Sequence, residues 1–332
     1  MLRRIAVLTG DDDAPGMNAA IRAVTRAAHH YDWGVFGICN GYEGLLQGEL
    51  IPLTTHSVDG VVQRGGSMLE SIDNSRFVTE AGQELALRTL NEQKIDAMIV
   101  IGGEETQTIA HALSKSKFAV NGVAASVEND LAGFDMIVGV DTALNLALDA
   151  IDHLKITKST DFCAILEVAG RRCGYLALVS AIASDADGVV IPEIETTPEE
   201  IEEIIRQERD HGHAHPVIVV AEGAVCNADR LMRHFAHNNP LNRREQPIRL
   251  GHIQRRAAPN AFDRFLGAYL GVCAVDALAR GEQGVIAGYL GGAARVLPYA
   301  EMIDKKKEIA PNLMQLASVF LPSYSRVSLS HS

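Results

Sequence analysis

The stretch Ile5-Ala6-Val7-Leu8-Thr9 is a short apolar run, and a helix-compatible segment follows it from Met17 to about His30. Turn-prone residues lie between the two, so the order is strand, loop and helix. The run is continuous rather than alternating, which is typical of a parallel strand buried on both faces. The opening of the chain therefore predicts an α/β fold.

The same order of strand, loop and helix recurs further along the chain. Apolar or β-branched runs lie at 97–101, 121–125, 162–168 and 217–220. A helix start is predicted at Thr197, because Pro198 follows this N-cap candidate and acidic residues fill the first turn. His211, His213 and His215 alternate after that helix, and without a further ligand group their spacing indicates a solvated turn rather than a metal site.

Composition narrows the class of protein. The chain has 332 residues, enough for two domains, with 47% apolar and 22% charged residues as in globular proteins. A net charge of -12 argues against a nucleic-acid partner. No stretch reaches the roughly 20 apolar residues that a membrane helix needs, and the N-terminus does not read as a signal peptide. Five scattered cysteines predict reduced thiols and a cytoplasmic location.

Ligands of parallel sheets bind beyond the carboxyl ends of the strands, so the loops that follow the predicted strands are the candidate site. Five segments there carry a recognisable pattern: Asp13 to Arg22, Ile101-Gly102-Gly103, Glu128-Asn129-Asp130, Ala169-Gly170-Arg171 and Leu250 to Arg255. In this order and at this spacing they resemble bacterial ATP-dependent 6-phosphofructokinase over essentially the whole chain. The resemblance implies two doubly wound α/β domains with parallel or mostly parallel sheets.

The resemblance also implies domain boundaries and an oligomer. The large, nucleotide-side domain would take residues 1–139 and 254–304, and the small, sugar-phosphate-side domain residues 140–253 and 305–332. The family usually forms tetramers. We therefore expect a homo- or hetero-oligomer, with another phosphofructokinase subunit as the partner in the second case.

The resemblance implies roles for individual residues of this chain, according to their positions in the matching motifs. The implied catalytic residues are Glu128, Asp130 and Arg171. The implied nucleotide positions are Gly10, Asp11, Asp12, Gly102, Gly103, Glu105 and Thr106, with Glu104 as the ligand of Mg²⁺ if the protein is active. The implied sugar-phosphate contacts are Ser126, Gly170, Glu222, His252 and Arg255. The implied effector residues are Arg22, Arg26, Lys155, Asp187, His211 and His213.

Several of these positions depart from the family pattern. Asp11 and Asp12 replace glycines whose backbone N–H groups approach phosphates. One carboxylate about 4 Å from a phosphate charge repels it by roughly 4 kcal/mol at an effective dielectric constant near 20. Glu70 and Glu105 replace two further glycines in these loops. The substitutions predict weak ATP binding if the side chains of Asp11 and Asp12 face the phosphates; in the alternative, these aspartates turn outward and cap the helix.

The catalytic loop departs as well. Glu128 replaces the aspartate that accepts the sugar hydroxyl proton, and an added methylene displaces its carboxylate on a scale that can cost about 10²-fold in rate. Phe162 and Gln246 stand where the family has arginines that reach across a subunit interface. Arg256 and Ala257 replace a glycine pair of the family that follows Gln254, and Arg256 could point into the cleft and neutralise the new carboxylates.

Three hypotheses follow. The chain is a non-catalytic subunit that binds sugar phosphate or regulates an active paralogue, or it is an active sugar kinase with altered donor or acceptor. The third hypothesis is a divalent-cation-binding module in which Asp11, Asp12, Asp13, Glu104, Glu105, Glu128 and Asp130 converge. In each case crowded carboxylates should have raised pKa values, so we expect stability to rise on mild acidification.

Overall fold

The computed structural model describes residues 3–10, 13–70, 77, 79–156, 162–213, 215–238 and 244–321, without the side chains of 162, 237, 238 and 244–246. The chain divides into two compact units. The first unit comprises Met1–Thr142 and Arg255–Lys307, and the second comprises Ala143–Gln254 and Glu308–Ser332. Each unit has its own sheet.

The first unit is built on a seven-stranded sheet with the order β11-β10-β5-β4-β1-β2-β3. The strands are β1 (Arg4–Thr9), β2 (Gly34–Ile38), β3 (Leu50–Leu53), β4 (Ala97–Gly102), β5 (Ala119–Ala124), β10 (Val285–Leu290) and β11 (Ala293–Pro298). All neighbours pair in parallel except β2 with β3 and β10 with β11, which are antiparallel. The central strands β1 and β4 are almost completely buried, as their continuous apolar sequence predicts.

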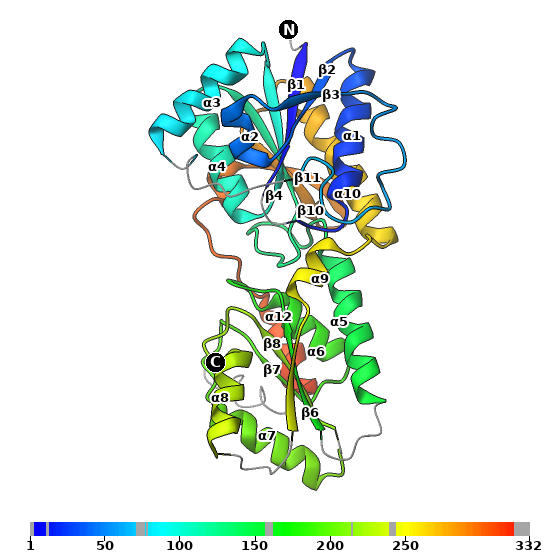
Figure 1. The fold of residues 1–332 in the computed structure, drawn as a ribbon, viewed down its shortest axis with the longest axis vertical. Helices are drawn as coiled ribbons and strands as arrows, with labels where there is room; N and C mark the ends of the chain where they lie inside the picture. Colours follow the sequence, from blue (N-terminus) through cyan, green and yellow to red (C-terminus); the bar gives the residue numbers. More distant parts are fainter. Residues whose placement is uncertain are drawn as a thin grey trace. The chain divides into compact units, whose positions relative to one another are not determined.

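Helices cover this sheet on both faces, with α1 and α10 on one face and α3 and α4 on the other (Figure 1). The helices are α1 (Met17–His30), α2 (Gly41–Gln47), α3 (Glu80–Glu92), α4 (Glu104–Lys115), α10 (Ala261–Ala279) and α11 (Tyr299–Met302). Helices α1 and α10 pack at close range because α10 carries glycine where they touch. A Cβ atom at Gly267 would lie 2.6 Å from the Gly16 carbonyl oxygen, and one at Gly271 would lie 2.8 Å from that of Ala20.

The second unit has a four-stranded parallel sheet with the order β7-β8-β6-β9. Its strands are β6 (Phe162–Val168), β7 (Gly188–Val190), β8 (Val217–Ala221) and β9 (Arg244–Arg249). Its helices are α6 (Tyr175–Ala183), α7 (Pro198–Asp210), α8 (Ala228–Asn238) and α12 (Pro311–Phe320), while α5 (Val140–Lys155) and α9 (Gly251–Arg256) each begin in one unit and end in the other. The core includes Ile165 and Ile218 from the sheet, Ile201 from α7 and Phe235 from α8.

Helix α7 begins where the sequence predicts. The Thr197 side chain accepts a hydrogen bond from the backbone N–H of Glu200, and the Glu200 carboxylate accepts one from the backbone N–H of Thr197. This capping box satisfies two N–H groups that the helix leaves without partners. Pro198 occupies the first helical position.

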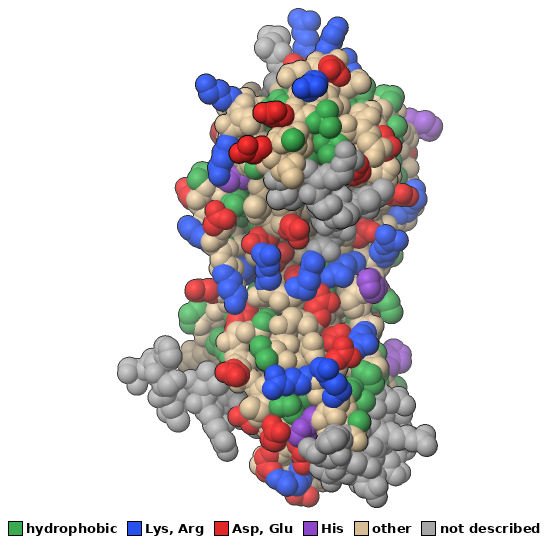
Figure 2. Space-filling view, turned by 60° about the vertical axis from the view of Figure 1, so that its left-hand side comes forward, with side chains coloured by type: hydrophobic (Ala, Val, Ile, Leu, Met, Phe, Trp, Pro, Cys, Tyr) green, Lys and Arg blue, Asp and Glu red, His purple; other side chains and the backbone are tan. Residues whose placement is uncertain are grey.

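The predicted α/β class with mostly parallel sheets is confirmed. The predicted helix from Met17 to His30 is α1. Within the described ranges, no helix has the length and apolar character needed to cross a bilayer. On the face drawn in Figure 2, acidic and basic side chains are interspersed over both units.

Candidate active site

The loop after β5 holds the first group of predicted site residues. Glu128 is 2% exposed, and its Oε1 lies 3.3 Å from Nη2 of Arg255, which follows in the chain after the second unit. The backbone N–H of Glu128 donates to Oγ of Ser126 at 3.1 Å, which fixes the turn of the loop. The carboxylate that replaces the family's aspartate is therefore buried and held by an arginine.

Asp130 is the second carboxylate of this loop. Its Oδ2 accepts a long hydrogen bond of 3.4 Å from the backbone N–H of Glu104, at the start of α4. Its Oδ1 is buried and has no hydrogen-bond partner. Burial, and to a smaller extent the negative charge of Glu128, raise the pKa of Asp130 to about 7. A carboxyl group with such a pKa is half protonated near neutral pH.

The residues present fit a magnesium ion. Mg²⁺ in phosphoryl-transfer sites is held by one or two carboxylates, with phosphates and water as its other ligands. Glu104 and Asp130 provide two carboxylates at the start of α4 and after β5, and Oδ1 of Asp130 lacks a partner that an ion would supply. The positive charge of the ion would also offset the unfavourable burial of Asp130.

The predicted nucleotide glycines lie at the ends of β1 and β4. A Cβ atom at Gly10 would lie 1.9 Å from Oγ1 of Thr106, and one at Gly102 would lie 2.6 Å from Cβ of the same residue. A Cβ atom at Gly103 would lie 3.1 Å from Oδ2 of Asp130. Thr106 is 2% exposed, so its side chain fills the space between the two strand ends.

Of the three aspartates in the first loop, Asp13 belongs to the described residues. Asp11 and Asp12 lie outside the described residues. Asp13 accepts the backbone N–H of Ser67 at Oδ1 (3.1 Å), and its Oδ2 lies 2.9 Å from Nε of Arg256. Arg256 therefore neutralises a carboxylate that matches the family pattern, and no described contact joins it to one of the substituted carboxylates.

The expected convergence of acidic residues on one cation is not borne out for the described residues. Asp13 is engaged by Ser67 and Arg256 instead. In the parts of the chain that are described, no three of Asp13, Glu104, Glu105, Glu128 and Asp130 bring ligand atoms within 4.8 Å of one another. The physical reason is that these acids leave different strand ends, where Ser67 and Arg256 bind Asp13 and Arg255 binds Glu128.

Glu70 and Glu105 also replace glycines of the family, and the structure describes both. Glu70 has a φ of 57°, in the left-handed region that glycine enters without cost. Its carbonyl oxygen accepts a hydrogen bond from Oγ1 of Thr9 at 3.4 Å. Glu105 is exposed in the first turn of α4, next to Glu104. Two negative charges therefore stand at the N-terminus of α4, where the helix dipole favours them.

The predicted sugar-phosphate residues of the second unit form their own group. Nε of Arg171 lies 3.7 Å from Oε1 of Glu222. Gly170 has a φ of 147°, and a Cβ atom there would lie 2.8 Å from the Cys173 carbonyl oxygen, so only glycine fits this turn. His252 is exposed in α9. The side chain of Arg171 is about half exposed.

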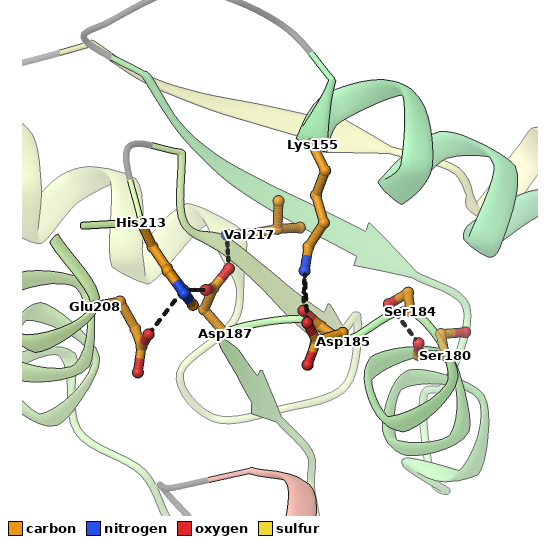
Figure 3. A network of polar contacts seen from close by, with 8 residues as sticks. All are labelled: Lys155, Ser180, Ser184, Asp185, Asp187, Glu208, His213 and Val217. Atoms are coloured by element: carbon orange, nitrogen blue, oxygen red, sulfur yellow. Dashed lines mark hydrogen bonds and ion pairs between the residues drawn. The ribbon is translucent and has the colours of Figure 1, made fainter. Parts of the chain in front are cut away.

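The predicted effector residues are distributed over both units. Arg22 is partly buried in α1, and Arg26 forms an exposed ion pair with Asp59 at 3.0 Å. In the second unit, Nζ of Lys155 donates to the backbone carbonyl of Asp185, while Asp187 and His213 are in direct contact (Figure 3). The remaining residue, His211, is exposed at the C-terminus of α7. The side chains at 162 and 246, where the family has interface arginines, lie outside the described set.

Two buried polar residues that sequence reasoning missed hold the loops of the site. Gln254, 0% exposed, accepts the backbone N–H of Ala169 and donates to the carbonyl of Ala143, both at 3.0 Å. Asp263, also 0% exposed, accepts the backbone N–H groups of Gly139 and Thr142 and the Thr142 hydroxyl at 2.6–2.8 Å. Burial raises the pKa of Asp263 to about 6. Gln254 lies within the Leu250 to Arg255 motif but is not among the implied site residues, and nothing in the local sequence of Asp263 distinguishes it from a surface polar residue.

Comparison with known proteins agrees with this arrangement. The family model "Phosphofructokinase" matches residues 4–278. The ATP-dependent 6-phosphofructokinase of Thermotoga petrophila is 38% identical over 318 residues, which cover 95% of this chain and 99% of that protein. The ATP-dependent 6-phosphofructokinase 1 of Thermus thermophilus is 37% identical over 321 residues, 96% of this chain and 99% of that protein.

Comparison with solved structures also finds phosphofructokinases. Pichia pastoris phosphofructokinase in the T-state superposes with a TM-score of 0.85 and 28% identity, and the match covers 99% of this chain and 37% of that longer one. The pyrophosphate-dependent phosphofructokinase of Marinobacter aquaeolei has a TM-score of 0.81 at 20% identity, covering 96% of this chain and 92% of that one, which supports the fold. The chain belongs to the phosphofructokinase family.

Proposed function

We propose that this protein transfers the γ-phosphoryl group of ATP to fructose 6-phosphate in glycolysis, at a rate lowered by its own substitutions. The observation that carries the proposal is a retained carboxylate in an otherwise matching chain. Relatives named ATP-dependent 6-phosphofructokinase are 38% and 37% identical over nearly their whole length. The loop after β5 keeps a buried carboxylate, Glu128, at the position of the family's base.

In this proposal Glu128 accepts the proton of the sugar hydroxyl as that oxygen forms its bond to phosphorus and the bond from phosphorus to ADP breaks. Asp130 and Glu104 would hold Mg²⁺, which supplies positive charge to the phosphate oxygens when bound. The rate is lowered because Oε1 of Glu128 is engaged by Arg255 at 3.3 Å. This contact must break, or the guanidinium must move, before the carboxylate can reach the sugar hydroxyl.

Substrate recognition would use both units. We propose that the first unit is the nucleotide side, with Gly10, Gly102 and Gly103 near the phosphates, and that the second unit is the sugar-phosphate side. Arg171 and His252 of the second unit are exposed or half-exposed, and each can donate to an anionic sugar phosphate. The full protein would be an oligomer, as the resemblance implies.

A second candidate function is a non-catalytic subunit that binds sugar phosphate. The Glu128–Arg255 ion pair favours it, because Oε1 of Glu128 is engaged by Nη2 of Arg255 instead of facing a substrate hydroxyl. Glu105 adds a negative charge beside Glu104 that a polyphosphate would meet. In this case the active partner would be another phosphofructokinase subunit.

One experiment separates the two. Purified protein is assayed for formation of ADP and fructose 1,6-bisphosphate, and Mg-ATP and fructose 6-phosphate are titrated separately by calorimetry. Turnover that Glu128→Gln abolishes supports the kinase. Sugar-phosphate binding without ATP binding or turnover refutes it and supports the non-catalytic subunit.

A further inference from the structure

Gln107, in the first turn of α4, is a buried side chain that joins the ends of two neighbouring strands. It is 0% exposed. Its Nε2 atom lies 3.0 Å from the carbonyl oxygen of Val100, 3.2 Å from that of Gly102 and 3.1 Å from that of Val123. The first two carbonyls belong to the end of β4 and the third to the end of β5. The amide of Gln107 therefore donates to both strands at the edge of the sheet where ligands of parallel sheets bind.

The hydroxyl of Tyr299 fixes the direction in which this amide points. It donates to Oε1 of Gln107 at 3.0 Å, and Tyr299, in α11, is 1% exposed. A glutamine amide has two N–H donors on its nitrogen and an acceptor on its oxygen. Reversing the amide would set Oε1 against three carbonyl oxygens, so this buried network permits a single orientation.

Strand β5 leaves room for the two side chains at Gly122. A Cβ atom there would lie 2.3 Å from Oε1 of Gln107 and 3.0 Å from the hydroxyl oxygen of Tyr299. Even alanine at this position would force both polar groups to move, because the interior has no space to spare. The backbone of β5 is therefore in direct contact with the Gln107–Tyr299 pair.

The two strand ends lead to the carboxylates that would hold magnesium. β4 continues through Gly103 into Glu104, and the backbone N–H of Gln107 donates to the carbonyl oxygen of Gly103 at 3.0 Å. β5 continues into the loop that carries Asp130, whose Oδ2 accepts the backbone N–H of Glu104 at 3.4 Å. A shift of β4 against β5 would therefore change the separation of the Glu104 and Asp130 carboxylates.

A second buried tyrosine holds the same turn of α4. Tyr42, in α2, is 0% exposed, and its hydroxyl donates to the carbonyl oxygen of Thr106 at 2.8 Å. Tyr42 and Tyr299 thus hold adjacent residues of α4 from distant parts of the chain. The first turn of α4 is fixed by side chains that have almost no exposed surface.

We propose that Gln107 is a positioning residue for the phosphoryl transfer proposed above, on which this inference rests. Gln107 has no exposed surface and does not touch a substrate. It acts through the strand ends, because tying β4 to β5 keeps Glu104 and Asp130 at the separation at which both can bind the Mg²⁺ of Mg-ATP. Groups that bind a metal must be held to within about 0.5 Å, and buried hydrogen bonds behind them supply that precision.

The test titrates the full chain and its variants with Mg-ATP and, separately, with fructose 6-phosphate by calorimetry. Gln107→Met keeps the length of the side chain and removes every hydrogen bond of the amide. Tyr299→Phe removes only the hydroxyl that orients the amide. Asn121→Leu is the matched control, because Asn121 of β5 is also 0% exposed and its Nδ2 bridges the carbonyl oxygens of Ala274 and Glu282. Thermal unfolding measures the stability of each variant.

We expect Gln107→Met to bind Mg-ATP at least about tenfold more weakly than wild type and to have a lower kcat, with unchanged affinity for fructose 6-phosphate. Tyr299→Phe should weaken Mg-ATP binding by a smaller factor, and it decides the test if Gln107→Met does not fold. Asn121→Leu should lose stability and keep the Mg-ATP affinity of wild type.

Wild-type affinity for Mg-ATP in Tyr299→Phe and in folded Gln107→Met would overturn the inference and leave the proposed function intact. An equal loss of Mg-ATP affinity in Asn121→Leu, or an equal weakening of both substrates in Gln107→Met, would also overturn it, because a purely structural role accounts for either result. If wild type itself binds no Mg-ATP and forms no ADP, the proposed function fails and this inference fails with it.

Discussion

Replacing Glu128 by aspartate should speed the proposed reaction. The substitution removes one methylene and draws the carboxylate back by about 1.3 Å, since a C–C bond is roughly 1.5 Å long. This restores the length of the family's base at a position that is 2% exposed and whose backbone is fixed by Ser126. Misplacement of a reacting group by about 1 Å can cost 10²-fold, so its correction can return a similar factor.

The same change weakens the contact with Arg255. The present separation of 3.3 Å corresponds to an attraction of about 5 kcal/mol at an effective dielectric constant near 20. At about 4.6 Å the attraction falls to about 3.6 kcal/mol, a loss of about 1.4 kcal/mol or roughly tenfold in the population of the released carboxylate. Both effects increase kcat and together would multiply to at most about 10³-fold, so we expect a total gain of at least about 10-fold.

The assay is steady-state formation of ADP from ATP and fructose 6-phosphate, coupled to a spectrophotometric readout. Glu128→Gln serves as the control that keeps size and removes the base. A fall in kcat for Glu128→Asp, with unchanged sugar-phosphate affinity, would refute the reasoning. It would mean that the longer side chain already reaches the hydroxyl, or that no reaction takes place in this loop.

Three further predictions concern stability, each measured by urea denaturation. Arg255→Ala should lower the free energy of unfolding by about 3 kcal/mol, because it removes the Arg255 guanidinium from the buried carboxylate of Glu128. The side chain of Arg256 is 80% exposed, so Arg256→Ala should lower the free energy of unfolding by less than about 1 kcal/mol. Equal decreases in the free energy of unfolding in these two variants would contradict the argument from burial. Asp263→Ala should cost roughly 3 kcal/mol at neutral pH because three buried donors lose their acceptor. The folded pKa of Asp263, about 6, lies above the unfolded value of about 3.9, so the folded state takes up a proton first as pH falls. The stability that Asp263 contributes therefore increases as the pH falls from 6 to 4. The decrease in the free energy of unfolding caused by Asp263→Ala should be larger at pH 4.5 than at pH 7.5. A decrease that becomes smaller on acidification would contradict this argument. Thr197→Ala should cost about 1 kcal/mol by removing the cap of α7, and Thr197→Ser should cost little.

Local sequence was sufficient for the elements that bury continuous apolar runs. Strands β1, β4 and β8 are almost fully buried, and their uninterrupted aliphatic residues predict this. The start of α7 was also predictable, because an N-cap threonine and a following proline act within one turn. The loops of the candidate site followed from a resemblance carried by motifs several residues long.

Partners of charged side chains were not predictable in the same way. The sequence placed Glu128 and Arg255 in one candidate site, but their separation of 127 positions gives no sign that they pair. The raised pKa of Asp130 was expected in direction from crowded acids, yet its largest cause is burial, which depends on what covers the loop. Asp13 was grouped with other acids by type and instead binds Ser67 and Arg256.

By itself the sequence determined the fold class, the family and the loops in which chemistry would lie. These depend on hydrophobic periodicity and on short motifs, which act over a few residues. Only the tertiary structure decided that Glu208 joins Asp187 and His213, because the three leave different elements and Glu208 is indistinguishable in sequence from the other acids of α7. Charge interactions act through space at distances of a few ångströms, so chain position alone does not specify them.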